Sequence, residues 1–185
     1  FVGRMVPEKG AHVIIESAPD VLSEYPDAKF ILVGRGGFLD ELKRRAAELN
    51  VGHKILFTGY VDDETLLQLY KVADVSTAPS LYEPFGIVAL EGMGAQVPVV
   101  VADSGGLGEI VEHQKSGITV FPGDPKSLAW GLLEVLKNPD EARQLREQAY
   151  QRVLDTFNWP MIARQTAEVY HRVMQEAQQG TPILR

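Results

Sequence analysis

The sequence SLYEPFGIVALEGMGAQVPVVV, at residues 80–101, contains the features that decide the fold. A polar loop ends at Gly86, a short apolar segment with one acid, Glu91, follows it, and an apolar run closes the stretch. The apolar segment is typical of a helix, and the run at residues 97–101 is typical of a buried strand. Gly86 would open the helix and leave its first backbone N–H groups free, which suits an anion. We therefore expect a phosphorylated, hydroxyl-rich ligand at this loop.

Apolar runs alternate with amphipathic segments along the whole chain. The remaining strands are expected at residues 30–33, 55–58, 75–77 and 116–121. The remaining helices are expected at residues 11–25, 38–50, 62–70, 126–137, 140–156 and 160–178. Continuous apolar strands that alternate with helices predict a parallel sheet covered on both faces, which is a doubly wound, Rossmann-like α/β domain.

Glycine-rich or charged loops follow the expected strands. They lie at residues 3–4, 34–37, 59–61, 79–86 and 104–108. In open parallel sheets ligands bind beyond the carboxyl ends of the strands, so we expect these loops to converge on one edge. The residues before Gly3 are interpreted as the end of a strand whose beginning is missing, and the chain is expected to be an excised domain.

Composition excludes several classes of protein. With 185 residues, 45% of them hydrophobic, the chain is long enough for one well-buried core. A net charge of −7 argues against extended contact with nucleic acid, but it does not exclude a local cationic pocket for one phosphate ligand. The chain has no cysteine, which fits a reducing compartment, and no apolar run long enough to span a membrane, so a cytoplasmic location is expected.

The loop GRMVPEKG at residues 3–10 places Arg4 and Lys9 around a turn before a helix. A guanidinium, an ammonium and free backbone N–H groups together could hold a diphosphate. The alternative is a pair of solvated surface charges. The loop is not a Walker A motif, because Lys9 precedes Gly10 and no Ser or Thr follows it. The stretch GRGGFL is not a dinucleotide fingerprint either, since Leu39 stands where the third glycine should be.

Two acids, Glu83 and Glu91, flank the Gly86 turn. They could be capping or surface acids. The apolar neighbours of Glu91 instead predict a buried or half-buried carboxylate, which needs hydroxyl or cationic partners such as a ribose diol. The four histidines are scattered, and no Asp-x-Asp pair ends a strand, so no metal site is predicted.

Taken together, these motifs resemble the C-terminal, nucleotide-sugar-binding domain of a family 4 retaining glycosyltransferase, a member of glycosyltransferase group 1 with the two-domain GT-B architecture. The resemblance covers essentially the whole chain. Its specific part is Glu83-Pro84-Phe85-Gly86 followed by Glu91, with GGLGEIV at residues 105–111 as support.

The resemblance implies a role for each matching residue. Arg4 and Lys9, with Gly3 beside them, match the basic pair that contacts the donor diphosphate and stabilises the departing charge. Glu83 matches the acid that contacts the hydroxyls of the donor sugar. The remaining matches are Phe85 and Gly86 through their N–H groups, Ile87 and Val88 beside the phosphates and ribose, Glu91 at the ribose, and Val61 at the base.

The implied activity is transfer of a hexosyl group, with glucose as the candidate, from a nucleotide-diphosphate sugar to a hydroxyl acceptor without a metal. Residues 1–178 would form the donor domain and residues 179–185 a frayed tail. The acceptor site, and any membrane contact, would belong to an absent N-terminal domain, so the isolated domain is expected to be inactive. The alternatives are a nucleotide-sugar epimerase on the same two-domain plan and a non-catalytic nucleotide-sugar-binding module.

Overall fold

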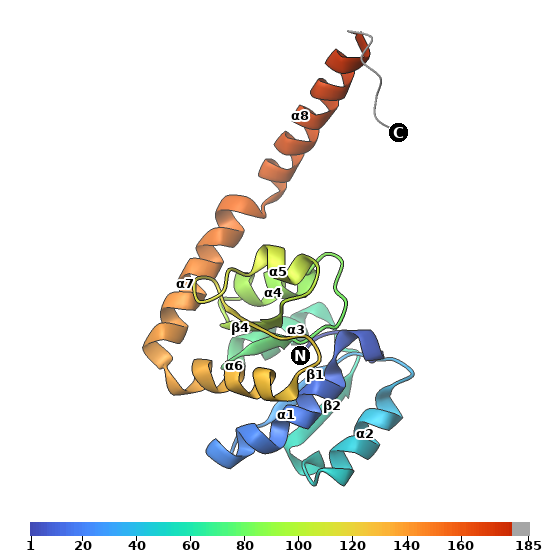
Figure 1. Cartoon of the computed structure of the whole chain (residues 1–185), viewed down its shortest axis with the longest axis vertical. Coiled ribbons are helices and arrows are strands. Elements are labelled where there is room, and N and C mark those ends of the chain that lie inside the picture. Colours follow the sequence, from blue (N-terminus) through green and yellow to red (C-terminus); the bar gives the residue numbers. More distant parts are fainter. Residues whose placement is uncertain (179–185) are drawn as a thin grey trace. The chain divides into compact units, whose positions relative to one another are not determined.

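A computed structural model describes residues 1–178 of the chain (Figure 1). The strands are β1 (Phe30–Val33), β2 (Ile55–Gly59), β3 (Ser76–Ala78), β4 (Val99–Ala102) and β5 (Ile118–Val120). The helices are η1 (Pro7–Lys9), α1 (Ala11–Glu24), α2 (Leu39–Glu48), η2 (Gly52–Lys54), α3 (Asp63–Val72), α4 (Ile87–Gly94), α5 (Gly106–Ile110), α6 (Pro125–Lys137), α7 (Pro139–Thr156) and α8 (Trp159–Gln178). The chain divides into two compact units, residues 1–150 and residues 151–185.

The strands of the first unit are parallel, which confirms the predicted α/β class. Strand β1 pairs with β2, and β4 pairs with β3 on one edge and β5 on the other. Helices α4 and α5 lie on one side of β4 and α6 lies on the other, as in a doubly wound sheet (Figure 1). The strands form two separate sheets within the described residues, because no strand there pairs with the outer edge of β3.

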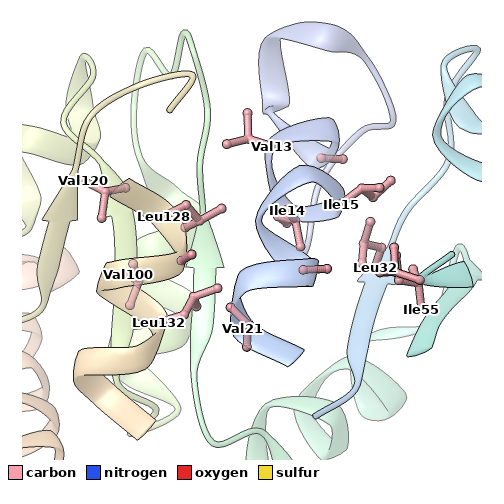
Figure 2. Packing of buried hydrophobic residues seen from close by; sticks show 14 of the residues in the cluster. Val13, Ile14, Ile15, Val21, Leu32, Ile55, Val100, Val120, Leu128 and Leu132 are labelled. Atoms are coloured by element: carbon pink, nitrogen blue, oxygen red, sulfur yellow. The ribbon is translucent and has the colours of Figure 1, made fainter. Parts of the chain in front are cut away.

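Helix α1 joins the two sheets through the hydrophobic core. Figure 2 shows Val21 on the side of α1 that faces Leu132 of α6, and Ile15 on the side that faces Leu32 of β1. All four side chains are buried. The helix therefore packs on β1 of one sheet and on α6, which covers the other sheet. Pro19 lies inside α1.

Local chemistry explains where several elements begin. The Asp62 carboxylate accepts a hydrogen bond of 2.8 Å from the Thr65 N–H, so Asp62 caps α3. The Asp124 carboxylate caps α6 in the same way, with the Lys126 N–H at 2.9 Å. Strand β4 begins after Pro98, later than expected, because proline has no N–H for a ladder.

The second unit contains the last residues of α7 and the whole of α8. Several large apolar side chains of α8 are exposed: Trp159, Ile162, Val169, Tyr170, Val173 and Met174. No helix within residues 1–178 combines the length and the hydropathy that crossing a membrane requires. The predicted frayed tail lies outside the described residues.

Candidate functional site

Backbone hydrogen bonds join the loops that follow the first strands. The Met5 N–H donates to the Arg35 carbonyl at 2.9 Å, and the Gly34 N–H donates to the Gly59 carbonyl at 2.8 Å. Gly34 also packs so closely on the loop at residues 3–10 that an added Cβ would lie 1.9 Å from the Gly3 carbonyl oxygen. The loop after β1 therefore contacts both the loop that carries Arg4 and Lys9 and the end of β2.

The loops that follow β3 and β4 join the same edge. The Leu81 N–H donates to the Glu8 carbonyl at 2.8 Å, and the Gly106 N–H donates to the Glu83 carbonyl at 2.8 Å. The Ser104 hydroxyl donates to the Ser80 carbonyl at 2.7 Å. These contacts confirm the prediction that the loops converge.

Lys9 and Glu83 form an ion pair between two of these loops. The Lys9 Nζ lies 2.5 Å from the Glu83 Oε2, although the two residues are 74 positions apart. Glu83 is only 7% exposed, and the Ser80 hydroxyl lies 3.4 Å from the same oxygen. Burial of a charged carboxylate is unfavourable because it loses its hydration. The attraction of the nearby ammonium offsets part of that free energy. Sequence reasoning placed both residues in one site but did not predict that they contact each other.

Arg4 lies on the same loop as Lys9, and its side chain is exposed. Within residues 1–178 its guanidinium has no hydrogen-bond or ion-pair partner. Its planar fork of N–H donors is therefore available to an anion that enters the site.

The turn at Gly86 sets the start of α4. Gly86 has φ +70°, and an added Cβ would lie 2.7 Å from the Ile110 Cδ1, so only glycine fits there without strain. The exposed fractions of Phe85 and Ile87 are 76% and 59%, while Val88 is half-buried. The start of α4 thus carries solvent-exposed apolar side chains. Beside them lie the first backbone N–H groups of the helix, which have no hydrogen-bond acceptor within α4.

Glu91 does not lie where the sequence predicted. Its side chain is exposed, because the face of α4 that packs on the sheet carries Ala89 and Met93 instead. The apolar composition of the helix was misleading, since Ile87 is itself exposed. Glu91 does have a hydroxyl partner within the protein, which the sequence did not predict: the Tyr70 hydroxyl donates to the Glu91 Oε2 at 3.2 Å.

Tyr70 is a residue that sequence reasoning missed. It lies near the end of α3 and is only 7% exposed, and its position in an amphipathic helix gave no signal beyond core packing. Burial, followed by the Glu91 charge, raises the pKa of the Tyr70 hydroxyl far above its ordinary value. The hydroxyl therefore keeps its proton and remains a hydrogen-bond donor to Glu91.

Two further residues, Arg35 and Tyr60, flank the predicted base position. The Arg35 guanidinium carbon lies 5.6 Å from the centre of the Tyr60 ring, which is a cation–π distance. Tyr60 is 67% exposed, and Val61 beside it is half-buried. The Arg35–Tyr60 contact has no sequence signature.

Residues 1–178 contain no group of three or more His, Asp or Glu side chains that could hold a metal ion. The metal independence inferred from the sequence stays a prediction.

Comparison with known proteins gives a consistent result. The sequence model of the family described as Glycosyl transferases group 1 matches residues 1–152. The uncharacterized glycosyltransferase MJ1607 of Methanocaldococcus jannaschii is 42% identical over 175 residues, which cover 95% of this chain and 45% of that protein. A glycogen synthase of Mycobacterium tuberculosis is 36% identical over 184 residues, covering 100% of this chain and 44% of that protein.

Solved structures agree with the sequence comparisons. Alr3699/HepE of Anabaena, solved in complex with UDP, superposes with a TM-score of 0.82 at 29% identity, covering 93% of this chain and 49% of that one. The same protein has also been solved with UDP-glucose. The chain thus spans less than half the length of these relatives. The family match extends over most of the chain, and the chain belongs to the Glycosyl transferases group 1 family.

Proposed function

We propose that this chain is the donor-binding domain of a retaining, GT-B glycosyltransferase of family 4, and that it binds a nucleotide-diphosphate sugar whose hexosyl group passes to a hydroxyl acceptor. The observation that carries the proposal is the Lys9–Glu83 ion pair, which lies where the loops of a parallel sheet converge. The Anabaena relative that binds UDP-glucose supports glucose as the sugar and uridine as the nucleoside.

In this proposal the cations hold the diphosphate. Arg4 offers a fork of donors from an exposed position, and Lys9 adds a point charge from the same loop. Both charges would stabilise the negative charge that grows on the leaving diphosphate, which is electrostatic stabilisation of the transition state. The N–H groups at the start of α4, which no side chain caps, would donate to the same anion.

The acids and the backbone would orient the rest of the donor. Glu83 accepts hydrogen bonds from the sugar hydroxyls, and Glu91 accepts them from the ribose. Val61 meets the base through its backbone. Because Glu83 already contacts Lys9, the donor has to share or replace that contact, so its phosphate and its sugar reach the two partners of one ion pair. Glu83 is thereby a residue that positions the sugar next to the departing phosphate.

Arg4→Ala tests the diphosphate assignment. Loss of one charged hydrogen bond is expected to weaken UDP binding by about 1.5–3 kcal/mol, which is roughly a 10- to 150-fold higher Kd. Titration calorimetry with UDP, ADP and GDP measures the effect and identifies the base at the same time.

Arg44→Ala is the matched control for that titration. It removes the same charge from the exposed face of α2, where Arg44 pairs with Glu41 and Glu48. Exposed ion pairs of this kind contribute little to stability, so the folded fraction should hardly change. If both variants bind UDP as tightly as the parent chain, Arg4 does not hold the diphosphate.

Glu91→Ala and Tyr70→Phe test the ribose assignment separately from the phosphate assignment. Glu91→Ala should weaken UDP binding and leave binding of glucose 1-phosphate unchanged, because that ligand has no ribose. Tyr70→Phe removes only the hydroxyl that holds Glu91. It should therefore also weaken UDP binding, but by less than Glu91→Ala does. Equal losses for UDP and glucose 1-phosphate in Glu91→Ala would contradict this role.

A further inference from the structure

A hollow of about 430 Å³ lies in the first unit, outside the loops that form the candidate site. Helices α6 and α7, which follow each other in the chain (Figure 1), supply two of its walls, and the turn before β5 supplies a third. The volume falls within the roughly 300–1,000 Å³ that is typical of small-molecule sites. The hollow is therefore large enough for a small organic ligand.

The floor of the hollow is apolar, whereas its rim is polar. Buried Ile118, Ala142 and Leu145 form the floor. Two carboxylates and three carboxamides surround it, on Glu134, Glu141, Gln114, Gln144 and Gln148. Among residues 1–178 no lysine or arginine lines the hollow, so its charge is negative and an anionic ligand is disfavoured.

Helical spacing brings several of these side chains to one place. Trp130 and Glu134 are four residues apart on α6, and Gln144 and Gln148 are four residues apart on α7. Residues at that spacing lie on the same face of a helix. Each of the two helices therefore directs a pair of lining residues toward the hollow.

Trp130 adds a flat apolar surface to this polar rim. Its side chain is 43% exposed, although its neighbours Leu128 and Ala129 are buried. The His113 ring stacks on the indole with a centroid distance of 6.2 Å and an interplanar angle of 27°. His113 is itself fixed by the Thr119 N–H, which donates to its Nδ1 at 3.1 Å. The indole is thus held in one orientation while part of its surface stays open to solvent.

The polar groups of the rim are available to a ligand. Within residues 1–178, no hydrogen bond or ion pair engages the side-chain amides and carboxylates named above. Gln114 also has φ +59°, a left-handed conformation that is uncommon for residues other than glycine, and its N–H donates to the Gly117 carbonyl at 2.8 Å. Strained positions of this kind are typical of functional sites.

We propose that this hollow binds a neutral glycan, with one hexopyranose ring against Trp130 and the hydroxyl groups of that ring toward the polar rim. A pyranose ring has an apolar C–H face and a border of hydroxyl groups, which matches an indole face beside polar side chains. A hydroxyl both donates and accepts hydrogen bonds; a carboxamide does the same, and a carboxylate accepts them. The hollow is distinct from the donor site, and this inference does not rest on the proposed function.

Other classes of ligand fit the hollow less well. A nucleotide could stack on Trp130, but the two carboxylates would repel its phosphates. A metal ion would need more ligands, and residues 1–178 contain no group of three or more His, Asp or Glu side chains that could hold one. A basic peptide would be attracted to Glu134 and Glu141, so it is a competing outcome of the test.

Tryptophan fluorescence tests the proposal. The chain has two tryptophans, so Trp159→Phe leaves Trp130 as the single indole. Trp159 is 82% exposed, and its replacement should leave the first unit folded. Titration with maltohexaose and with cellohexaose should give a saturable change with a millimolar Kd for at least one of the two sugars. That Kd should depend neither on added UDP, because the donor site is elsewhere, nor on NaCl, because the sugar is uncharged.

Further variants in the same background locate the binding. Gln144→Ala combined with Gln148→Ala should raise the Kd at least 10-fold, and both glutamines are exposed, so the fold should survive. Gln114→Gly should also raise the Kd and keep its turn, since glycine adopts a positive φ without strain. Gln68→Ala removes an exposed amide from α3 and is the matched control, with an unchanged Kd. Circular dichroism verifies that each variant is folded.

The absence of a saturable change with both oligosaccharides would overturn the proposal, as would a change that survives the combined Gln144 and Gln148 substitutions. A Kd that UDP raises would place the sugar in the donor site and would also count against it. If tetralysine alters the fluorescence in a salt-dependent way while neither sugar does, the hollow is a site for a basic peptide instead.

Discussion

Gly10→Ala is expected to destabilise the first unit by about 4 kcal/mol. Gly10 has φ +73°, a conformation that costs an L-residue roughly 1–2 kcal/mol. An added Cβ would also lie 1.9 Å from the Pro79 carbonyl oxygen, and relieving such an overlap costs about 1–3 kcal/mol more. Urea unfolding followed by circular dichroism measures the change as a lower midpoint at similar slope.

Gly37→Ala is the matched control for that experiment. Gly37 lies in the neighbouring glycine-rich loop, is exposed, and has no other atom within 4 Å of an added Cβ. Its stability should stay within about 0.5 kcal/mol of the parent chain. A Gly10→Ala variant as stable as Gly37→Ala would mean that the loops at residues 3–10 and 79–86 do not pack as described.

Lys9→Met is expected to destabilise the same unit by about 3 kcal/mol and also to weaken UDP binding. The methionine fills the space of the lysine stem, but it leaves the Glu83 carboxylate buried without its cation. Breaking a buried ion pair by removing one partner costs about 3–5 kcal/mol, and the partial exposure of Lys9 places the value near the lower limit. Urea unfolding and titration calorimetry measure the two effects on one sample.

Glu83→Gln separates the two roles of the ion pair. The amide removes the buried charge with little change in shape, so Lys9→Met should cost less stability in the Glu83→Gln background than alone. UDP binding should survive Glu83→Gln, whereas the difference in affinity between UDP-glucose and UDP should shrink. If the two losses of stability simply add, the ion pair has no coupling energy and the central feature of the proposed site is wrong.

The sequence was sufficient to predict that the loops would converge, because the carboxyl ends of parallel strands meet at one edge whatever the side chains are. It could not predict that Lys9 contacts Glu83 across 74 positions, since only the folded chain brings those loops together. The burial of Glu91 was predicted wrongly for a related reason. The apolar composition of a helix does not reveal which of its faces another element covers, and here Ile87 is left exposed.

Helix α5 shows where local propensity fails. The glycines at residues 105–108 predicted a turn, because glycine is a poor helix former. The structure instead begins α5 at Gly106, where an added Cβ would lie 2.7 Å from the Phe85 carbonyl carbon. Close approach between two loops thus requires glycine at a position where helix propensity alone would disfavour it.

Tyr70 has a second contact beyond the one that holds Glu91. It also lines a cavity of about 600 Å³ near β1 and β3, so one side chain borders both that cavity and the acid at the predicted ribose position. A side chain shared in this way links two equilibria thermodynamically. Whatever free energy a ligand in the cavity adds to the nucleoside contact, the nucleoside must return to that ligand in equal measure.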